Sequence, residues 1–520
     1  MDKRNLLKIA IVAVALAALA GKRWLLPHHE HPDAPASTQG AAIVQKPGER
    51  GFTLGALAFA PCELGQRNSA ATTTAFCAPF QVPENWDKPD GRKIDLKLAL
   101  VRSAAALAER DLIVLLAGGP GQAATEVYPS VAAGFAPLLE HRNVLLLDQR
   151  GTGGSHPLRC KDDPDDFTAA TGGDIDFAKV RKQTQTCLDE ISRTADPAQY
   201  TTNVALRDLE AVRQALGAPP LDLVGVSYGT RVAQQYLRRY PDAVRSVVLD
   251  SAVPNELVLG SEFAIDLDAA LKAGFAECTR TPACANAFGD PYASLYGLRD
   301  ALAMKAPTVA FRNSRSNAEE SKPLDAYTFA SVVRMFAYSS ETSALLPLAI
   351  DRALNGDYAP LLGQANLLTD ELSDLSGNGM QLSVICAEDA NLLIDRPEDA
   401  QLILGDVFAK VWRAQCAIWP HGSRPADFHA PIKNDKPVLL LSGEFDPVTP
   451  PRYAEQIVKG LPNGRVLVAK GQGHSVIGRG CLPKLVKRFV EKLDPKNLDA
   501  GCIANFGPTP AFTSFNGAAP

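Results

Sequence analysis

Short apolar runs alternate with amphipathic segments over the first half of this chain. Between residues 51 and 255, runs such as Leu112–Leu116 and Asn143–Leu147 are bounded by turn residues, and Thr202–Leu216 repeats its apolar positions at helical spacing. Apolar runs of this length are typical of buried strands. Strands that alternate with helices form a parallel sheet with helices on both faces. The pattern therefore predicts an α/β fold with a mostly parallel central sheet.

A long helical region interrupts this pattern between about residue 256 and residue 430. Four segments there have helical periodicity: Glu262–Cys278, Pro291–Met304, Ala326–Ala337 and Ala344–Leu354. Between residues 431 and 500 the strand pattern returns with two apolar runs, Pro437–Leu441 and Arg465–Ala469. A helical insertion between two parts of one sheet predicts a cap that covers a site at the edge of the sheet.

The N-terminus has the pattern of a targeting segment. Basic residues precede the apolar run Ile9–Ala20, and Ala18–Ala20 has the small residues of a cleavage site. Further apolar residues follow, so residues 6–26 could instead stay uncleaved as a membrane tether. The predicted parts are a signal peptide or anchor (1–26), a linker (27–50), the first part of the core (51–255), the cap (256–430), the C-terminal part of the core (431–505) and a tail (506–520).

Composition narrows the class of protein. The chain has 520 residues, of which 46% are hydrophobic, and this supports a large core with an added domain. Its net charge of −5 and its lack of long basic runs argue against nucleic acid as a partner. No phosphate loop or dinucleotide fingerprint is present, and the cysteines form no close C-x-x-C pairs. Neither a cofactor nor a metal is therefore expected.

Ten cysteines favour an exported protein, either periplasmic or secreted. An even number of cysteines in an exported chain suggests disulfides, which persist in oxidising compartments. Sequence does not fix their connectivity, and one or two pairs could be buried thiols. Because neighbouring cysteines fall within one predicted subregion each, we favour five local pairs: 62–77, 160–187, 278–284, 386–416 and 481–502.

The pentapeptide Gly225-Val226-Ser227-Tyr228-Gly229 lies between a predicted strand, Leu221–Val224, and a predicted helix, Thr230–Tyr240. A G-x-S-x-G turn in this position is a nucleophile elbow, which holds the serine oxygen exposed at the end of the sheet. The pentapeptide occurs by chance in many chains, and the alternative is an ordinary glycine-rich turn. The strand and helix around it favour Ser227 as a nucleophile.

Loops after the last two predicted strands offer an acid and a base for this serine. In hydrolases with such an elbow the order along the chain is Ser, then Asp or Glu, then His. Asp446 follows the first of these strands, and His474 follows the second between glycine turns. Both loops should therefore lie at the edge of the sheet that holds Ser227. Glu444 and Asp250, which ends an earlier strand, are the alternative acids.

An oxyanion hole is predicted beside the nucleophile. Gly118 and Gly119 follow a predicted strand, and consecutive glycines let backbone N–H groups approach a developing negative charge. The second donor is the N–H of Tyr228, the residue after the nucleophile. The alternative for the glycines is a flexible turn. Arg150, in the next loop, is placed to pair with a carboxylate and to brace the oxyanion loop.

Five motifs occur in an order that resembles a known family. They are A-G-G-P-G and D-Q-R-G-T-G-G-S after successive strands, then G-V-S-Y-G-T, F-D-P-V-T-P and G-Q-G-H-S. From about residue 50 to residue 505 the chain resembles the proline iminopeptidase and tripeptidyl aminopeptidase group of serine peptidases, and most closely its secreted tripeptidyl-aminopeptidase-like branch. The resemblance implies an α/β-hydrolase fold, with Ser227 as nucleophile, Asp446 as acid and His474 as base.

The same resemblance implies that Gly118 or Gly119 and Tyr228 supply the oxyanion donors. The chain departs from the family at one position, because many proline iminopeptidases have His where this chain has Ala117. The donors are backbone groups, so activity should survive the difference. The strictly proline-specific subfamily is less favoured.

An aminopeptidase must also recognise a free amino group, for which a carboxylate is the usual counter-charge. The related peptidases carry an acidic residue after a cysteine in the cap, and here Glu388 and Asp389 follow Cys386. Glu388 or Asp389 is therefore predicted to bind the N-terminus of a peptide substrate, and the alternative is a solvated helix cap. The predicted protein is an exported aminopeptidase; a carboxylesterase or lipase on the same fold is the alternative, and a non-catalytic binding protein is a remote one.

Overall fold

A computed structural model describes residues 42–45, 50–65, 71–105, 108–160, 175–313, 316–363 and 378–517. The predicted signal peptide or anchor, including the tether at residues 6–26, and most of the predicted linker lie outside these residues. Within the described residues, no helix is both long enough and apolar enough to cross a membrane.

The described residues form an eleven-stranded sheet in the order β1-β2-β3-β4-β5-β7-β6-β8-β9-β12-β13. The strands are β1 (Ile43–Val44), β2 (Phe52–Leu54), β3 (Leu57–Gly65), β4 (Thr72–Pro83), β5 (Lys93–Val101), β6 (Leu112–Leu116), β7 (Asn143–Leu147), β8 (Leu221–Val226), β9 (Val244–Asp250), β12 (Val438–Gly443) and β13 (Gly464–Ala469). From β7 onward, neighbouring strands are parallel, as the pattern predicts.

The N-terminal part of the sheet differs from the predicted alternation of strands and helices. Strands β1 to β5 pair in antiparallel fashion, and β5 joins the parallel part through an antiparallel pairing with β7. The described parts of the connections between these strands contain no helix, and antiparallel neighbours need none, whereas parallel strands require a crossover. The alternation therefore begins only at β6.

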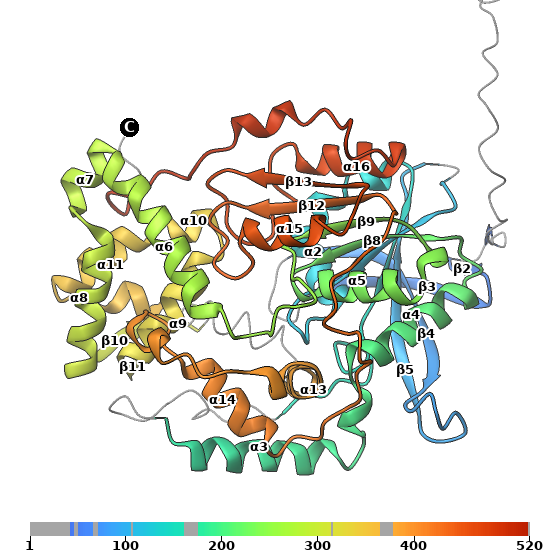
Figure 1. Ribbon diagram of the computed structural model, residues 1–520, viewed down its shortest axis with the longest axis horizontal. Helices are drawn as coiled ribbons and strands as arrows, with labels where there is room; N and C mark the ends of the chain where they lie inside the picture. The colour runs from blue at the N-terminus through green and yellow to red at the C-terminus, as the bar shows by residue number, and fades with distance from the viewer. Residues whose placement is uncertain are drawn as a thin grey trace, which may run out of the picture. The chain divides into compact units, whose positions relative to one another are not determined.

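Helices cover both faces of the sheet (Figure 1). Helices α2 (Ala124–Phe135) and α16 (Leu482–Lys492) pack on one face, and α4 (Thr202–Ala215), α5 (Tyr228–Arg239) and α15 (Pro451–Val458) pack on the other. The alternation of side chains along β6 shows how the two faces differ. Ile113 and Leu115 pack in the same cluster as α2, whereas Val114 and the residues two positions before and after it pack in the cluster on the opposite face. The strand is buried along its whole length because both faces are covered.

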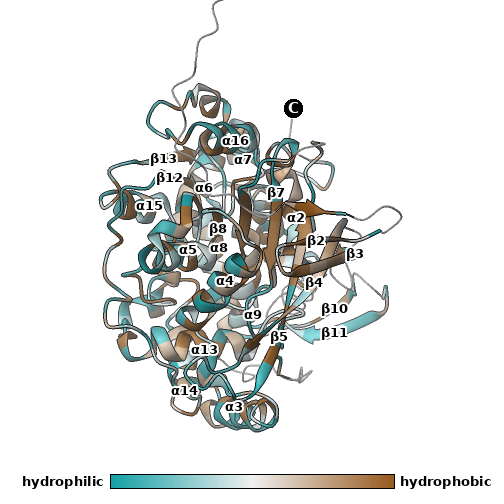
Figure 2. Cartoon of the chain, turned by 90° about the vertical axis from the view of Figure 1, so that its right-hand side faces the viewer, coloured by the Kyte–Doolittle hydropathy of each residue, from teal (hydrophilic) through white to brown (hydrophobic). Residues whose placement is uncertain are grey.

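Much of the inserted region has a hydrophobic core of its own, which includes Leu267, Phe329 and Leu346. Its helices are α6 (Phe263–Arg280), α7 (Pro282–Phe288), α8 (Pro291–Met304), α9 (Ala326–Ala337), α10 (Ser340–Ser343) and α11 (Leu346–Leu354). The four helices predicted from periodicity are confirmed as α6, α8, α9 and α11. A two-stranded sheet of β10 (Thr308–Arg312) and β11 (Glu319–Pro323) was not predicted, because β11 has no apolar alternation and is hydrophilic in Figure 2.

Two other helices of the inserted region pack against the first part of the core. Helices α13 (Asn378–Glu388) and α14 (Val407–Cys416) contact α3 (Phe177–Ile191), which comes from the first part of the core. Buried residues of these helices belong to the same cluster as the α4 and α5 face of the sheet. The short 3₁₀ helices are η1 (Leu138–Glu140), η2 (Pro197–Gln199), η3 (Pro241–Ala243), η4 (Ala390–Leu392), η5 (Pro397–Gln401) and η6 (Gly501–Asn505). The inserted region is thus two units, one with its own core and one continuous with the sheet.

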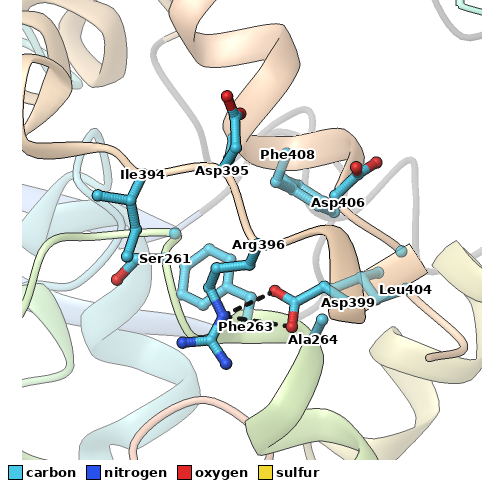
Figure 3. A pocket seen from close by; sticks show the side chains of 13 residues that line it. Ser261, Phe263, Ala264, Ile394, Asp395, Arg396, Asp399, Leu404, Asp406 and Phe408 are labelled. Carbon is cyan, nitrogen blue, oxygen red and sulfur yellow. Dashed lines mark hydrogen bonds and ion pairs between the residues drawn. The ribbon is translucent and has the colours of Figure 1, made fainter. Parts of the chain in front are cut away.

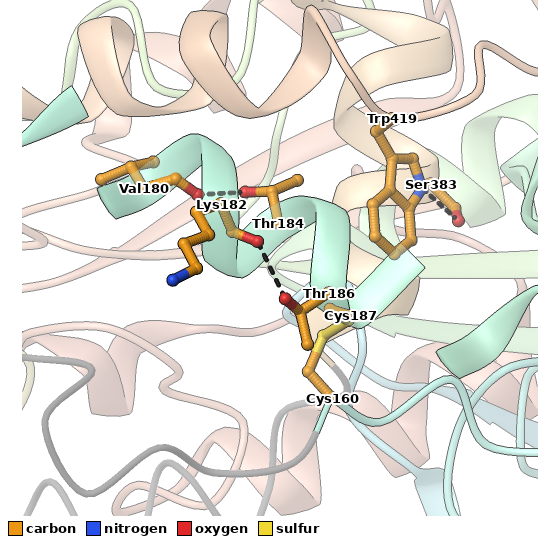
Figure 4. Close-up of a disulfide and its surroundings, with 8 residues drawn as sticks. All are labelled: Cys160, Val180, Lys182, Thr184, Thr186, Cys187, Ser383 and Trp419. Carbon is orange, nitrogen blue, oxygen red and sulfur yellow. Dashed lines mark hydrogen bonds between the residues drawn. A yellow bond between two sulfur atoms is a disulfide. The ribbon is translucent and has the colours of Figure 1, made fainter. Parts of the chain in front are cut away.

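All five predicted disulfides form in the structure. The pairs are Cys62–Cys77, Cys160–Cys187, Cys278–Cys284, Cys386–Cys416 and Cys481–Cys502. Figure 4 shows Cys160–Cys187 beside α3, near the buried Trp419, whose Nε1 donates a hydrogen bond to Ser383. All ten cysteines are paired, so the alternative of buried thiols is wrong. Five disulfides indicate an exported protein, because oxidised pairs persist outside the reducing cytosol.

Removal of the Cys386–Cys416 disulfide should destabilise the protein more than removal of Cys278–Cys284. The two bridges span 30 and 6 residues, and a longer loop gains more freedom when the unfolded chain is released. Replacement of both cysteines by alanine should lower the free energy of unfolding by about 3–4 kcal/mol for the first pair and by about 2 kcal/mol for the second. Urea unfolding without reductant measures both values, and equal losses would contradict the loop argument.

Candidate active site

Ser227 lies in the turn between β8 and α5 with φ 55° and ψ −125°. A non-glycine residue at positive φ is strained, and such strain is concentrated at functional sites. Its backbone N–H donates to the carbonyl of Asp250 at 2.9 Å. A Cβ at Gly229 would overlap the backbone oxygen of Leu116, and one at Gly225 would overlap Gly229. The two glycines therefore let α5 and β6 close tightly enough to hold the turn in this conformation.

The predicted oxyanion loop lies against Ser227. A Cβ at Gly118 would be 3.2 Å from the Cβ of Ser227, so the two backbones are in close approach. Gly119 has φ +107°, a conformation that side chains disfavour. Tyr228 is the first residue of α5, and the first N–H groups of a helix have no partner within the helix. The structure thus places Gly118 against Ser227, with Gly119 next along the loop and Tyr228 next to the serine in the chain.

Asp446 and His474 form a hydrogen-bonded pair. His474 Nδ1 lies 3.0 Å and 2.9 Å from the two carboxylate oxygens of Asp446. Asp446 also accepts hydrogen bonds from the N–H groups of Val448 and Thr449, at 2.9 Å and 2.8 Å, and from the Thr449 hydroxyl at 2.8 Å. This arrangement fixes the orientation of the imidazole and leaves its Nε2 free of Asp446.

The pairing sets the charge of both groups. Burial alone would raise the pKa of Asp446, but the His474 imidazole and the backbone N–H donors lower it to about 2. Burial alone would lower the pKa of His474, but the Asp446 carboxylate raises it above its ordinary value of 6.5. Asp446 is therefore ionised at neutral pH and stabilises the protonated form of the imidazole.

The two alternative acids contact the His474 loop and not the imidazole. Asp250, which burial shifts to a raised pKa, accepts from the backbone N–H groups of Val476 and Ile477 at 3.0 Å and 2.9 Å. Glu444 accepts from the N–H of Gly471 at 2.8 Å. Glu444 thus holds the loop on the N-terminal side of His474, and Asp250 holds it on the C-terminal side. Both contribute to the position of His474 through backbone hydrogen bonds.

The inserted region covers His474. The His474 N–H donates to the carbonyl of Tyr338 at 2.7 Å, and the two rings meet edge to face at 5.2 Å. A Cβ at Gly473 would overlap that carbonyl, so only glycine permits the contact. As a result the His474 side chain is only 10% exposed. Tyr338 was not identified from the sequence, because no local pattern reports a contact between segments more than a hundred residues apart.

Two buried polar groups hold the loop that follows β7. Arg150 forms a bidentate ion pair with Asp208 on α4, with both N–O distances 2.6 Å, which confirms its predicted pairing with a carboxylate. It also donates to the carbonyls of Pro83, Glu84 and Gln199, so it joins this loop to α4 and to the end of β4. The oxyanion loop is braced instead by Asp148, which the sequence did not single out.

Asp148 accepts hydrogen bonds from the Thr125 N–H at 2.8 Å and from the Thr125 hydroxyl at 2.9 Å. Thr125 is in the first turn of α2, directly after the oxyanion loop. Asp148 also accepts from the Gly154 N–H at 3.0 Å. A buried carboxylate therefore ties the start of α2 to the loop that contains Arg150.

Glu388 and Asp389 are fully buried, so neither is the solvated helix cap that was the alternative. Glu388 accepts from the Thr202 N–H at 2.8 Å, and burial raises its pKa to about 7. Asp389 forms an ion pair with Arg231 on α5 at 2.8 Å. Both carboxylates join α13 to the helices that flank the nucleophile elbow.

A pocket opens between the start of α6 and the segment before α14 (Figure 3). Its wall combines aromatic and charged side chains, and Arg396 donates to Asp399 at 3.2 Å and 3.3 Å. The lining side chains include Ser261, Phe263, Ile394, Asp395, Arg396, Asp399, Leu404, Asp406 and Phe408. The pocket lies within the inserted region and contains none of the residues predicted for catalysis.

The site as a whole contains the groups needed for acyl transfer: a serine on a strained turn, an imidazole paired with an ionised carboxylate, and N–H groups beside the serine. In the part of the chain that the structure describes, no group of three His, Cys, Asp or Glu residues is placed to hold a metal ion. These are the groups with which serine hydrolases form and hydrolyse an acyl-enzyme.

Comparisons with known proteins agree with this chemistry. Residues 111–479 match the model of a family described as alpha/beta hydrolase fold. A serine protease named Hip1 from Mycobacterium tuberculosis is 25% identical over 465 residues, which cover 83% of this chain and 88% of the relative. A tripeptidyl aminopeptidase from Streptomyces coelicolor is 26% identical over 474 residues, 84% of each chain. A carboxylesterase B from Mycobacterium tuberculosis is 27% identical over 494 residues, 86% of this chain and 91% of the relative.

The pKa shifts predict the pH dependence of hydrolysis. If His474 is the general base, activity requires its neutral form, so kcat/KM should rise as pH passes through the raised pKa, and the midpoint of this rise should lie above 6.5. A short ester without ionisable groups isolates this titration from that of Glu388. Asp446→Asn should lower kcat about 10⁴-fold and move the midpoint to lower pH, because the imidazolium loses its counter-charge. A midpoint below 6.5 for the wild type would contradict the role of His474 as the base.

Proposed function

This chain belongs to the α/β-hydrolase fold family and is a serine hydrolase, and from that premise we propose that it is an exported aminopeptidase. It would release N-terminal residues or short peptides from peptide substrates that have a free amino group. Two curated relatives are named as a serine protease and a tripeptidyl aminopeptidase, and each matches more than four fifths of this chain. The observation that carries the proposal is a buried carboxylate, Glu388, beside the nucleophile elbow.

In the proposed reaction, Ser227 attacks the carbonyl carbon of the scissile bond while His474 accepts the hydroxyl proton. The Tyr228 N–H and the Gly118–Gly119 loop stabilise the oxyanion of the tetrahedral intermediate. His474 then gives its proton to the leaving amine, and the acyl group stays on Ser227. Water attacks this acyl-enzyme and passes a proton to His474, which returns the proton to the Ser227 oxygen as the acid leaves.

Asp446 has two roles in this reaction. Its hydrogen bond to Nδ1 keeps the proton of neutral His474 on that nitrogen, which leaves Nε2 unprotonated to serve as the base. Its negative charge stabilises the imidazolium that forms in both steps. The low pKa of about 2 keeps Asp446 ionised over the whole range in which His474 can act.

Glu388 is the better of the two candidates for the substrate amino group. One of its oxygens accepts from Thr202, and the other, Oε2, has no hydrogen-bond partner among the described groups. The Thr202 hydroxyl lies 2.5 Å from the hydroxyl of Tyr228, so the carboxylate is close to the residue that follows Ser227. Because Glu388 is fully buried, the proposal requires side chains to move aside when the substrate enters.

Asp389 has less to offer a ligand, since its charge is balanced by Arg231. Both side chains of this pair are fully buried. Removal of one partner from a buried ion pair leaves the other charge uncompensated. Asp389 therefore serves better as an anchor between α13 and α5.

An esterase is the second candidate function, because the same catalytic residues act on esters and a curated relative is named carboxylesterase B. The two functions differ in their dependence on a free amine.

We place the protein in the periplasm or outside the cell, on the basis of its disulfides. Whether it is tethered there depends on residues 6–26, which lie outside the described residues.

Paired chromogenic substrates test the function. Anilides of single residues, dipeptides and tripeptides with a free N-terminus should be hydrolysed, and the same anilides should resist hydrolysis when N-acetylated. Ser227→Ala should lower kcat by at least about 10³-fold, because no other group replaces the nucleophile. The most rapidly hydrolysed anilide gives the number of residues released. Hydrolysis of a short ester but of no anilide would favour the esterase.

Glu388→Gln should raise KM for free-amine anilides by about 10-fold to 100-fold, which is the range expected for loss of a charge-assisted hydrogen bond. Hydrolysis of a short ester should change little, since glutamine can still accept from Thr202. Asp389→Asn is the matched control. It should lower the midpoint of thermal unfolding without a selective rise in KM. Equal losses on anilides and ester for Glu388→Gln would remove Glu388 from substrate recognition.

A further inference from the structure

Arg334 on α9 is a cation in contact with aromatic rings near the catalytic residues. Its guanidinium carbon lies 4.3 Å from the ring centre of Phe263 and 4.9 Å from that of Phe408. Both rings also line the pocket of Figure 3. Stacking on aromatic faces fixes the planar guanidinium and removes part of its hydration. Arg334 is therefore positioned in advance and partly desolvated.

The hydrogen-bonding capacity of Arg334 is largely unused. Among the described residues it forms no ion pair, and its side chain donates one hydrogen bond, from Nη2 to the Tyr338 hydroxyl at 3.3 Å. A guanidinium has five N–H donors, and the Arg334 side chain is partly exposed. By contrast, the buried Arg150 and Arg231 are each paired with a carboxylate. Arg334 thus retains the charge and the donors to bind an anion.

One aromatic ring lies between Arg334 and the catalytic imidazole. The guanidinium carbon is 5.9 Å from the ring centre of Tyr338, and the Tyr338 ring meets the His474 ring at 5.2 Å. The two groups also interact electrostatically. Burial lowers the pKa of His474 and Asp446 raises it, and the charge of Arg334 acts against that rise.

The reaction chemistry indicates which part of a substrate lies on this side. His474 must give a proton to the leaving nitrogen, so the fragment that leaves is next to the imidazole. The leaving fragment of a peptide ends in a carboxylate, and in a short peptide that carboxylate is only one or two residues from the scissile bond. A guanidinium pairs with a carboxylate through two parallel hydrogen bonds.

We propose that Arg334 is a specificity-determining residue that binds a carboxylate of the leaving fragment and so selects short peptides with a nearby anionic group. The proposal rests on the proposed aminopeptidase function. Two sources of the carboxylate have the same chemistry: the C-terminus of a short peptide and an acidic side chain in the leaving fragment. Tyr338, whose hydroxyl accepts a hydrogen bond from Arg334 and whose ring contacts His474, positions the guanidinium.

The test compares three sets of peptides that have the same N-terminal part. One set has a two-residue leaving fragment with a free C-terminus, the second has the same fragment as its C-terminal amide, and the third is the amide with Glu in the fragment. The wild type should hydrolyse the free acid with a KM about tenfold lower than the amide. If an acidic side chain can replace the C-terminal carboxylate, the KM for the third set should be as low as that for the free acid.

Variants assign the preference to Arg334. Arg334→Met keeps much of the apolar contact with Phe263 and Phe408, and it should abolish the difference between acid and amide. Arg334→Lys should keep part of the difference between acid and amide, because lysine keeps the positive charge but lacks the planar guanidinium that pairs with a carboxylate through two hydrogen bonds. Arg352→Met is the matched control, since Arg352 is an exposed arginine over the ring of Phe515. It should leave the ratio of acid to amide unchanged.

Anilide substrates separate the two proposals, because an anilide leaving group has no carboxylate. At a pH well above the His474 midpoint, where a shift of that midpoint has no effect, Arg334→Met should hydrolyse them within about twofold of the wild type. An equal loss on anilides and free acids would show a purely structural role and overturn the proposal. Equal wild-type KM for acid and amide would also overturn it. If no free-amine anilide is hydrolysed, the aminopeptidase function fails, and butyrate esters of 4-hydroxybenzoic acid and 4-hydroxybenzamide then give the same comparison for Arg334.

Discussion

The turn at Ser227 is the constraint on which the rest of the site depends. A serine at φ 55° costs free energy that the surrounding structure must supply. That supply comes from the close packing of Gly225 and Gly229 against neighbouring backbone and from the hydrogen bond between the Ser227 N–H and the Asp250 carbonyl. Because β8 is a central strand, any change in the sheet would be transmitted to this turn. The sheet is thus the rigid support on which a strained nucleophile can persist.

Buried carboxylates position the loops around that turn. Asp250 and Glu444 hold the His474 loop from both sides, and Asp148 ties α2 to the loop after β7. These groups accept hydrogen bonds mainly from backbone N–H groups, so they organise the chain where regular strands have ended. Among these carboxylates and Asp446, Asp446 alone hydrogen-bonds to the imidazole. Carboxylates with a similar sequence context therefore have different roles. Asp446 bonds to the imidazole ring, whereas the other carboxylates bond to backbone N–H groups.

The inserted region completes the site from outside the sheet. Tyr338 covers His474 with a backbone hydrogen bond and a ring contact, and Arg334 lies behind it. On the other side, Glu388 and Asp389 join α13 to Thr202 and Arg231. The two units of the region thus approach the catalytic residues from different directions. The contacts with Tyr338 reduce the exposure of the His474 side chain to 10%, and the sheet alone could not make them.

The sequence by itself determined the strands from β6 onward, four helices of the inserted region and the loops that hold Ser227, Asp446 and His474. These features depend on local patterns: apolar runs, helical periodicity and glycines at sharp turns. The five disulfide pairs could also be predicted, since each joins neighbouring cysteines. The antiparallel pairing of β1 to β5 could not, because strand direction depends on which strands meet.

Only the tertiary structure decided which acid faces the imidazole, which residues of the inserted region reach the site, and that Glu388 and Asp389 are buried. Asp250, Glu444 and Asp446 all follow strands that end at the same edge of the sheet, so their sequence positions are equivalent. The contact between Tyr338 and His474 joins segments that are far apart along the chain, and no pattern in either segment encodes the other. Such contacts are determined by the packing of whole elements, and that packing depends on all the residues between them.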